Sequence, residues 1–188
     1  MSTKRTARAI VAVESSGGMK KTLLLVAGLV IALLAVWLVR SQSPGANGPR
    51  PAGRILDLSF TDYAGKRVAL KDFLGTPLVV NSWAAWCPFC RQELRDFAAV
   101  QAEFGDTVVI VAIDRAESLA TSKKYSDELG VTDKLILLLD PGDTFYQAMG
   151  GFSMPETIFV DAQGAAVFHK RGPMDIEEIR QRVVSLIK

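Results

Sequence analysis

The sequence predicts an α/β domain, with a mixed central sheet and helices on both of its faces, behind one N-terminal transmembrane helix. Strand and helix patterns alternate along the last roughly 135 residues, which is enough chain for one domain with a single core. The last two strand patterns surround a tight turn, so an antiparallel pair joins the βα units in the sheet. A charge-free apolar run lies near the N-terminus, ahead of a stretch rich in Pro and Gly.

The apolar run from Leu23 to Val39 is the predicted membrane anchor. Its roughly 17 residues just reach the length of a membrane-spanning helix. Several Lys and Arg residues precede the run and only Arg40 follows it closely, so the positive-inside rule predicts a cytoplasmic N-terminus and an extracytoplasmic C-terminal part. A cleaved signal peptide is the alternative, but its apolar core would be shorter, and the residues from Trp37 to Arg40 offer poor cleavage chemistry.

Four regions follow from this pattern. We expect a basic cytoplasmic N-terminus at residues 1–21, a transmembrane anchor at 22–40, a flexible linker at 41–53 and the folded domain at 54–188. The expected localisation is the cytoplasmic (inner) membrane, with a single pass and the C-terminal domain in the periplasm.

The formal charge also divides between these regions. The total of +2 is the sum of +6 over residues 1–50, which hold seven Lys or Arg and one Glu, and −4 over the rest of the chain. A mildly acidic domain gives no reason to expect nucleic-acid binding. The basic N-terminal residues suit the anionic inner surface of a membrane instead.

Element by element, the domain pattern begins with strands at residues 55–58 and 68–70 around a turn at 63–66, and a buried strand at 78–82. Apolar residues at helical spacing predict a helix over 87–104. A strand at 108–113, a helix at 118–129 and a strand at 135–139 then form an extra βα unit, and a short helix follows at 143–149. Strands at 157–160 and 166–168 around a turn at 161–164, and a helix at 175–187, end the chain.

The segment WAAWCPFCRQE holds the chain's only two cysteines, Cys87 and Cys90. Cys87 is expected where a strand ends and a helix begins, where free backbone N–H groups and the helix dipole stabilise a thiolate. Pro88 suits a first helical turn because it has no N–H to lose. A spacing of three places Cys90 about one turn further on, close enough to form a disulfide and to resolve a mixed disulfide made by Cys87.

A cysteine pair at this spacing has two other possible uses. A structural disulfide would close a very small loop and would constrain the unfolded chain little. A structural zinc site would need two more ligands, and the chain has one His and no further Cys. Catalytic thiol–disulfide exchange is therefore the preferred interpretation, and it requires no cofactor and no metal.

The domain resembles the membrane-anchored thioredoxin-like proteins of the TlpA, ResA and CcmG (DsbE) group. The resemblance rests on VVNSWAAWCPFCRQE, on VVIVAID with its following helix, and on GGFSMPETIFVDAQGAAVFHKRGPM, and it covers roughly Asp57 to Lys188. It implies a thioredoxin-like fold, an extracytoplasmic location and dithiol–disulfide exchange. The implied partners are thiols and disulfides of exported client proteins and a membrane or extracytoplasmic redox partner.

The resemblance also implies roles for single residues. Cys87 would be the exposed nucleophile, Cys90 the resolving thiol, and Glu93 an acid that assists proton transfer, although an ordinary solvent-facing Glu is the alternative. Thioredoxin has an Asp where this strand has Asn81, which makes Glu93 the better acid candidate. The expected substrate-binding residues are Trp86, Pro88, Phe89, Met154, Pro155 and Glu156.

Two of these assignments carry alternatives. Pro155 would be a cis-proline that lies across from the cysteines, with Met154 offering backbone groups to an extended substrate; a proline that merely limits a strand edge is the alternative. Glu156 would line the substrate groove, and an ordinary paired strand residue is an equally open reading. His169, the single histidine, is expected at the surface.

Within this interpretation we expect a reductase rather than a thiol oxidase, because the Pro-Phe pair between the cysteines supplies no cation to stabilise a thiolate. A Cu(I) chaperone of Sco-like role is another hypothesis, since paired thiolates bind Cu(I), but that family uses a wider cysteine spacing and a distant His. A peroxiredoxin is a third, and it requires a hydroxyl three residues before its cysteine, where this chain has Ala84.

Overall fold

The structure is a computed structural model that describes residues 24–26, 28–34, 50–51 and 53–188. In the described part of the chain, one sheet of eight strands has the order β1-β8-β7-β4-β5-β6-β2-β3. The strands are β1 (Arg50–Pro51), β2 (Ser59–Asp62), β3 (Arg67–Ala69), β4 (Leu78–Trp83), β5 (Val109–Arg115), β6 (Ile136–Asp140), β7 (Glu156–Val160) and β8 (Ala165–Arg171). The helices are α2 (Gly53–Leu56), α3 (Cys90–Phe104), α4 (Leu119–Leu129), α5 (Thr144–Met149) and α6 (Ile176–Leu186), with 3-10 turns at Leu70–Phe73 and Gly105–Thr107. The predicted mixed α/β sheet is confirmed.

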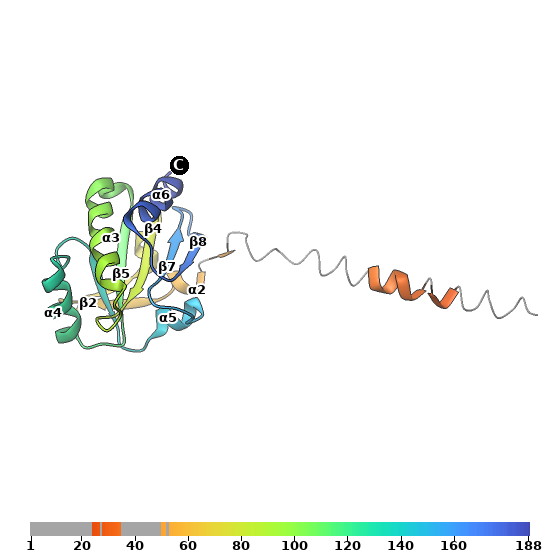
Figure 1. Ribbon diagram of the computed structural model, residues 1–188, viewed down its shortest axis with the longest axis horizontal. Helices are drawn as coiled ribbons and strands as arrows, with labels where there is room; N and C mark the ends of the chain where they lie inside the picture. The colour runs from red at the N-terminus through yellow and green to blue at the C-terminus, as the bar shows by residue number, and fades with distance from the viewer. Residues whose placement is uncertain (1–23, 27, 35–49, 52) are drawn as a thin grey trace, which may run out of the picture. The chain divides into compact units, whose positions relative to one another are not determined.

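The centre of the sheet is parallel and its flanks are antiparallel. β4 pairs in parallel with β5, and β5 with β6, while β7 and β2 run antiparallel to their neighbours. α3 connects β4 to β5 and α4 connects β5 to β6 (Figure 1). Because parallel strands end at the same edge, the loops after Trp83, Arg115 and Asp140 meet on one side of the sheet, which is where open α/β sheets place their sites.

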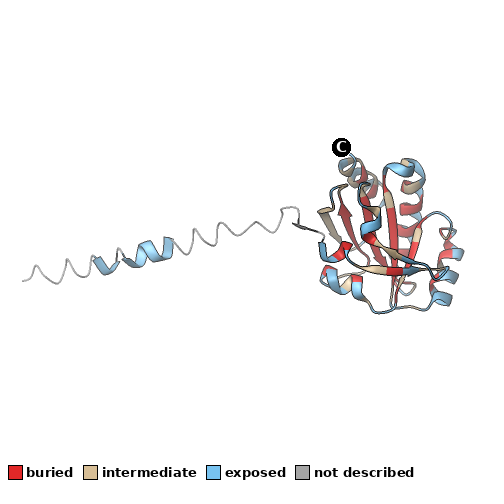
Figure 2. Ribbon diagram, turned by 180° about the vertical axis from the view of Figure 1, so that it is seen from behind, coloured by how far each residue is buried: buried red, intermediate tan, exposed pale blue. Residues whose placement is uncertain are grey.

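The sheet separates two apolar layers because successive strand side chains point to opposite faces. One layer packs Val79, Ile110 and Phe159 against α3 and α6. The other packs Val80, Val111, Ile158 and their neighbours against α2 and α5. Figure 2 shows the buried residues concentrated along the central strands and the inner helix faces. Helices therefore cover both faces, as the sequence predicts.

The helix ends follow signals visible in the sequence. Ser118 precedes α4, and its side chain accepts a hydrogen bond from the Thr121 N–H; Gly130 ends the helix in a left-handed conformation. Asp175 precedes α6 and accepts from the Glu178 N–H. These caps confirm the predicted helices near residues 118–129 and 175–187 to within one or two residues.

Two expectations about element boundaries are wrong. Residues 55–58 were expected to form a strand, but Ile55 and Leu56 belong to the short helix α2, where both are buried against α5 and the neighbouring 3-10 turn. The first hairpin strand is β2, four residues later. The helix that carries the cysteines begins at Cys90 rather than at Cys87. Within the predicted linker, Arg50 and Pro51 form β1 and pair with Ala166 and Ala165 of β8.

In the N-terminal part, residues 24–26 and 28–34 are helical. Among the residues that the structure describes, no helix has the length and apolar character needed to cross a membrane. The expected cytoplasmic N-terminus at 1–21, most of the expected linker and both ends of the expected anchor lie outside the described residues. The contact pattern separates residues 1–47 from the folded unit, 48–188.

Candidate active site

A disulfide joins Cys87 and Cys90, whose Cα atoms lie 5.4 Å apart, at the edge where the parallel strands end. β4 delivers the chain into a turn that carries Cys87, and α3 begins at Cys90. The Cys90 N–H donates a hydrogen bond to Cys87 Sγ at 3.2 Å. This bond would stabilise negative charge on Cys87 when the pair is reduced, which favours Cys87 as the attacking thiolate.

The expectation that Cys87 is the exposed sulfur is wrong for the disulfide state. Cys87 is 1% exposed and Cys90 is 0% exposed, because both pack into the apolar layer with Trp83, Ala84 and Leu94. Burial raises the free energy of a thiolate. The hydrogen bond from the Cys90 N–H therefore stabilises a Cys87 thiolate more strongly here than it would at an open surface.

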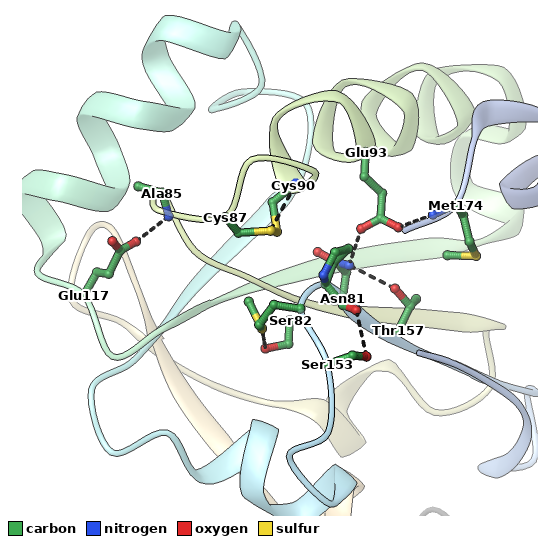
Figure 3. The surroundings of a disulfide bond; sticks show 12 residues. Asn81, Ser82, Ala85, Cys87, Cys90, Glu93, Glu117, Ser153, Thr157 and Met174 are labelled. Carbon is green, nitrogen blue, oxygen red and sulfur yellow. Dashed lines mark hydrogen bonds between the residues drawn. A yellow bond between two sulfur atoms is a disulfide. The ribbon is translucent and has the colours of Figure 1, made fainter. Parts of the chain in front are cut away.

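Glu93 lies one turn after Cys90 and is 2% exposed, which excludes the solvent-facing alternative. Its Oε2 accepts from Asn81 Nδ2 at 3.0 Å, and its Oε1 accepts from the Met174 N–H at 2.9 Å (Figure 3). Burial, the largest effect, raises the pKa of the Glu93 carboxyl to about 8, although both hydrogen bonds oppose the rise. The carboxyl therefore holds a proton near neutral pH and can exchange it, as general acid–base chemistry requires.

A pair of acidic residues, Asp114 and Glu117, borders the same loop and was not expected from the sequence. Glu117 Oε2 accepts from the Ala85 N–H at 2.7 Å, two residues before Cys87 (Figure 3). Asp114, at the end of β5, is fully buried and accepts from the Glu117 N–H at 3.1 Å. Burial and the Glu117 carboxyl raise the pKa of Asp114 to about 7. The sequence signal that could have predicted this pair is Asp114, an acidic residue near the carboxyl end of a buried parallel strand.

The segment before β7 forms the opposite border of the site. The Met154–Pro155 bond is cis, as the family resemblance implied. β7 pairs with β4 through Glu156 and Ser82, so the preceding residues continue beside the start of the cysteine loop. Met154 packs against the apolar layer that contains both cysteines. Its sulfur lies 3.9 Å from Ser82 Oγ.

Exposed apolar side chains surround the disulfide sequence. Trp86 is 59% exposed and Phe89 is 60% exposed, and Pro88 between the cysteines is also exposed. Phe152, three residues before Pro155, is 75% exposed and was not singled out from the sequence. These side chains are accessible at the surface, and the substrate-binding role expected for Trp86, Pro88 and Phe89 stays a prediction.

Glu156 is fully buried, so its carboxylate cannot line an open groove as expected. Its Oε2 accepts from the Phe152 N–H at 3.3 Å, and its Oε1 lies 2.8 Å from His169 Nε2 and 3.4 Å from Arg171 Nε. Glu156 therefore holds the Phe152 segment in place instead of offering its carboxylate at the surface. His169 is half-buried against this carboxylate rather than an ordinary surface residue.

The comparisons with known proteins agree with this geometry. The family described as AhpC/TSA matches residues 52–168, which include both cysteines and Pro155. The chain belongs to this thioredoxin-fold family. It is 31% identical over 176 residues to the thiol:disulfide interchange protein DsbE of Pseudomonas aeruginosa, covering 89% of this chain and 94% of that one. The DsbE of Allochromatium vinosum is 30% identical over 179 residues, covering 89% and 93%.

A solved structure gives the same result for the fold. Mycobacterium tuberculosis dsbF, in mixed oxidized and reduced forms, superposes with a TM-score of 0.66 at 26% identity, covering 71% of this chain and 97% of that one. Together with the disulfide of Cys87 and Cys90, these relatives make the protein a thiol–disulfide oxidoreductase. Within the AhpC/TSA family, Ala84 still leaves it without the hydroxyl that a peroxidatic site requires.

Proposed function

We propose that the protein reduces disulfides of exported client proteins, with the folded domain outside the cytoplasmic membrane and an N-terminal anchor at residues 22–40. The charge-free run after a basic N-terminus supports the anchor and its orientation. Apocytochrome c and copper-site proteins are the clients that we propose, because both need reduced cysteines in an oxidising compartment. Relatives named thiol:disulfide interchange proteins support exchange with other proteins.

The observation that carries the reducing direction is the weak stabilisation of a Cys87 thiolate. In the described part of the chain, the hydrogen bond that reaches Cys87 Sγ comes from the Cys90 backbone. Arg91, the nearest cation in sequence, lies with its guanidinium 3.7 Å from Glu128 and over the Tyr125 ring instead. Strong thiol oxidants depend on a stabilised reduced form, and this site offers little of that stabilisation.

The proposed reaction begins with the reduced pair. The Cys87 thiolate attacks one sulfur of the client disulfide, and the other client sulfur leaves as a thiolate that takes up a proton. Cys90 then loses its proton and attacks Cys87 Sγ, which releases the second client thiol and forms the Cys87–Cys90 disulfide. Glu93, one helical turn from Cys90, would accept that proton when it is ionised and return it when the pair is reduced again.

Client trapping tests this proposal directly. In the full-length Cys90→Ala chain, a mixed disulfide on Cys87 cannot be resolved, so clients should accumulate and be released by dithiothreitol. The Cys87→Ala chain is the matched control and should trap none. Recovery of exported proteins with reduced functional cysteines would support the reductase role, whereas recovery of thiol oxidases and their clients alone would replace it with oxidative folding.

The location needs its own test. A membrane-impermeant maleimide should label the reduced Cys87 and Cys90 in intact cells that produce the full chain, and should fail to label a cytoplasmic control thiol. Labelling that requires lysis would contradict the proposed orientation.

A further inference from the structure

Arg115, the last residue of β5, lies over two aromatic rings that come from different segments. Its Cζ is 3.5 Å from the centroid of the Tyr146 ring in α5 and 6.0 Å from the centroid of the Trp86 ring. Trp86 directly precedes Cys87 in the loop after β4. Cation–π contact with both rings therefore connects the cysteine loop to α5.

The guanidinium is held in place by a two-point ion pair. Arg115 Nε lies 2.7 Å from Asp143 Oδ1, and Arg115 Nη2 lies 3.0 Å from Asp143 Oδ2. The side chains of Arg115 and Asp143 are 24% and 20% exposed, so water competes less than at an open surface. Asp140, the buried last residue of β6, accepts from the Phe145 N–H at 2.7 Å and so fixes the start of α5. A planar group bound at two points has a defined orientation, as stacking requires.

Tyr146 continues the contact to the segment that ends at Pro155. The Gly151 N–H donates to the Tyr146 carbonyl at 2.9 Å, and Gly151 has a φ of +58°. A Cβ on Gly151 would lie 3.1 Å from Tyr146 Cε1, so the glycine backbone is against the ring. Trp86, Arg115, Tyr146 and Gly151 thus form one continuous series of contacts between the two borders of the disulfide site.

We propose that Arg115 is a positioning residue for client recognition. Through its contact with the Tyr146 ring and its cation–π attraction to the Trp86 ring, it fixes Trp86 relative to the segment from Gly151 to Pro155, and so prepares the site for an extended protein segment. This inference rests on the proposed exchange with protein clients. A small disulfide, which reaches the sulfur without spanning both borders, would gain much less from this arrangement.

A purely structural role is the competing explanation, because the ion pair with Asp143 also joins β5 to α5. The two explanations differ in what they predict for substrates of different size. Loss of stability would lower turnover of every substrate in proportion to the unfolded fraction. Loss of positioning would lower turnover of a protein disulfide more than that of a small one.

The test compares Arg115→Met with the wild-type chain, using insulin as the protein probe and oxidised glutathione as the small one. We expect the ratio of kcat/KM for insulin to that for oxidised glutathione to fall about fivefold, mainly through KM, since one cation–π contact has about this worth. In Arg115→Lys, which keeps the charge but loses the planar group, the ratio should fall by a smaller factor. Arg180→Met is the matched control, because Arg180 is also half-buried and ion-paired, with Glu103 near the far end of α3.

The ring provides a second variant that leaves the ion pair with Asp143 in place. Tyr146→Leu should lower the same substrate ratio, and Tyr146→Phe should retain the wild-type ratio. An unchanged ratio in Arg115→Met and Tyr146→Leu, or a ratio lowered equally in Arg180→Met, would overturn the inference. A wild-type chain that reduces neither probe would instead overturn the proposed function.

Discussion

Asn81 Nδ2 donates to Glu93 Oε2 at 3.0 Å and to Thr157 Oγ1 at 2.9 Å, so the strand orients the acid of the helix instead of supplying one of its own. All three side chains are buried or nearly so. The amide can donate to the carboxyl in either protonation state, whereas a strand Asp would repel it once both were ionised. The arrangement leaves Glu93 as the buried acid closest in sequence to the disulfide.

Glu93→Gln should change how stability depends on pH. The pKa of Glu93 is about 8 in the folded protein, against an ordinary value of 4.5. The folded state therefore binds this proton more tightly, and the resulting stabilisation is complete below pH 4.5 and is lost as pH rises through about 8. We expect the oxidised wild type to lose on the order of 5 kcal/mol relative to Glu93→Gln over this range, measured by urea unfolding. If the free energy of unfolding depended on pH equally in both proteins, the raised pKa of Glu93 would be contradicted. Glu128→Gln, at an exposed position, is the control and should keep the wild-type pH dependence.

Asn81→Ala should raise the pKa of Glu93 further. The hydrogen bond from Asn81 lowers that pKa, so its removal leaves burial less opposed. The midpoint can be followed by NMR of the Glu93 side-chain carbon. Thr157→Val is the matched control, because it removes the other acceptor of Asn81 and leaves the contact with Glu93. A lower pKa of Glu93 in Asn81→Ala would contradict this prediction, because it would show that the Asn81 hydrogen bond does not set that pKa.

Gly151→Ala and Gly150→Ala should separate backbone strain from contact with Tyr146. Both glycines have positive φ, +58° and +105°, so either alanine should cost about 1–2 kcal/mol of stability. Only at Gly151 would the new Cβ meet the Tyr146 ring; at Gly150 nothing lies within 4 Å. We expect only Gly151→Ala to lower insulin reduction relative to oxidised glutathione. Equal effects of the two substitutions on that ratio would refute a specific role for the ring.

Glu156→Gln should destabilise the domain more than a similar change at an exposed pair. Glu156 is fully buried, and its charge faces His169 and Arg171. Glutamine can still accept from the Phe152 N–H but carries no charge to balance the Arg171 guanidinium, so we expect a loss of about 1–3 kcal/mol in urea unfolding. Glu178→Gln, which breaks the partly exposed pair with Lys170, should cost below about 1 kcal/mol. Comparable losses would mean that the buried carboxylate contributes no more than a surface charge.

Much of the fold could be predicted because its signals are local. The apolar strands on either side of α3, the Ser118 and Asp175 caps and the glycine stops each follow from nearby residues. The segment at residues 55–58 could not be predicted in this way. Its apolar residues suit a strand equally well, and only packing against α5 and the 3-10 turn at Leu70–Phe73 makes it a helix.

The site was predicted in part for the same reason. Cys87, Cys90 and Glu93 are close in sequence, so helical spacing placed them together. Asp114 and Glu117 reach the cysteine loop only through pairing of β4 with β5, and their role depends on that register. The burial of Glu156 likewise depends on contacts with β8, thirteen or more residues away in the chain.

The reduction potential of the Cys87–Cys90 pair tests the account most directly. The full chain would be equilibrated in thiol–disulfide buffers of known potential, and the two thiols counted by alkylation. We predict one reversible two-electron transition with a midpoint at about −200 mV or below. A midpoint near about −120 mV, the value of a strong thiol oxidant, would contradict the reducing role. A bridge that no buffer opens would contradict exchange itself.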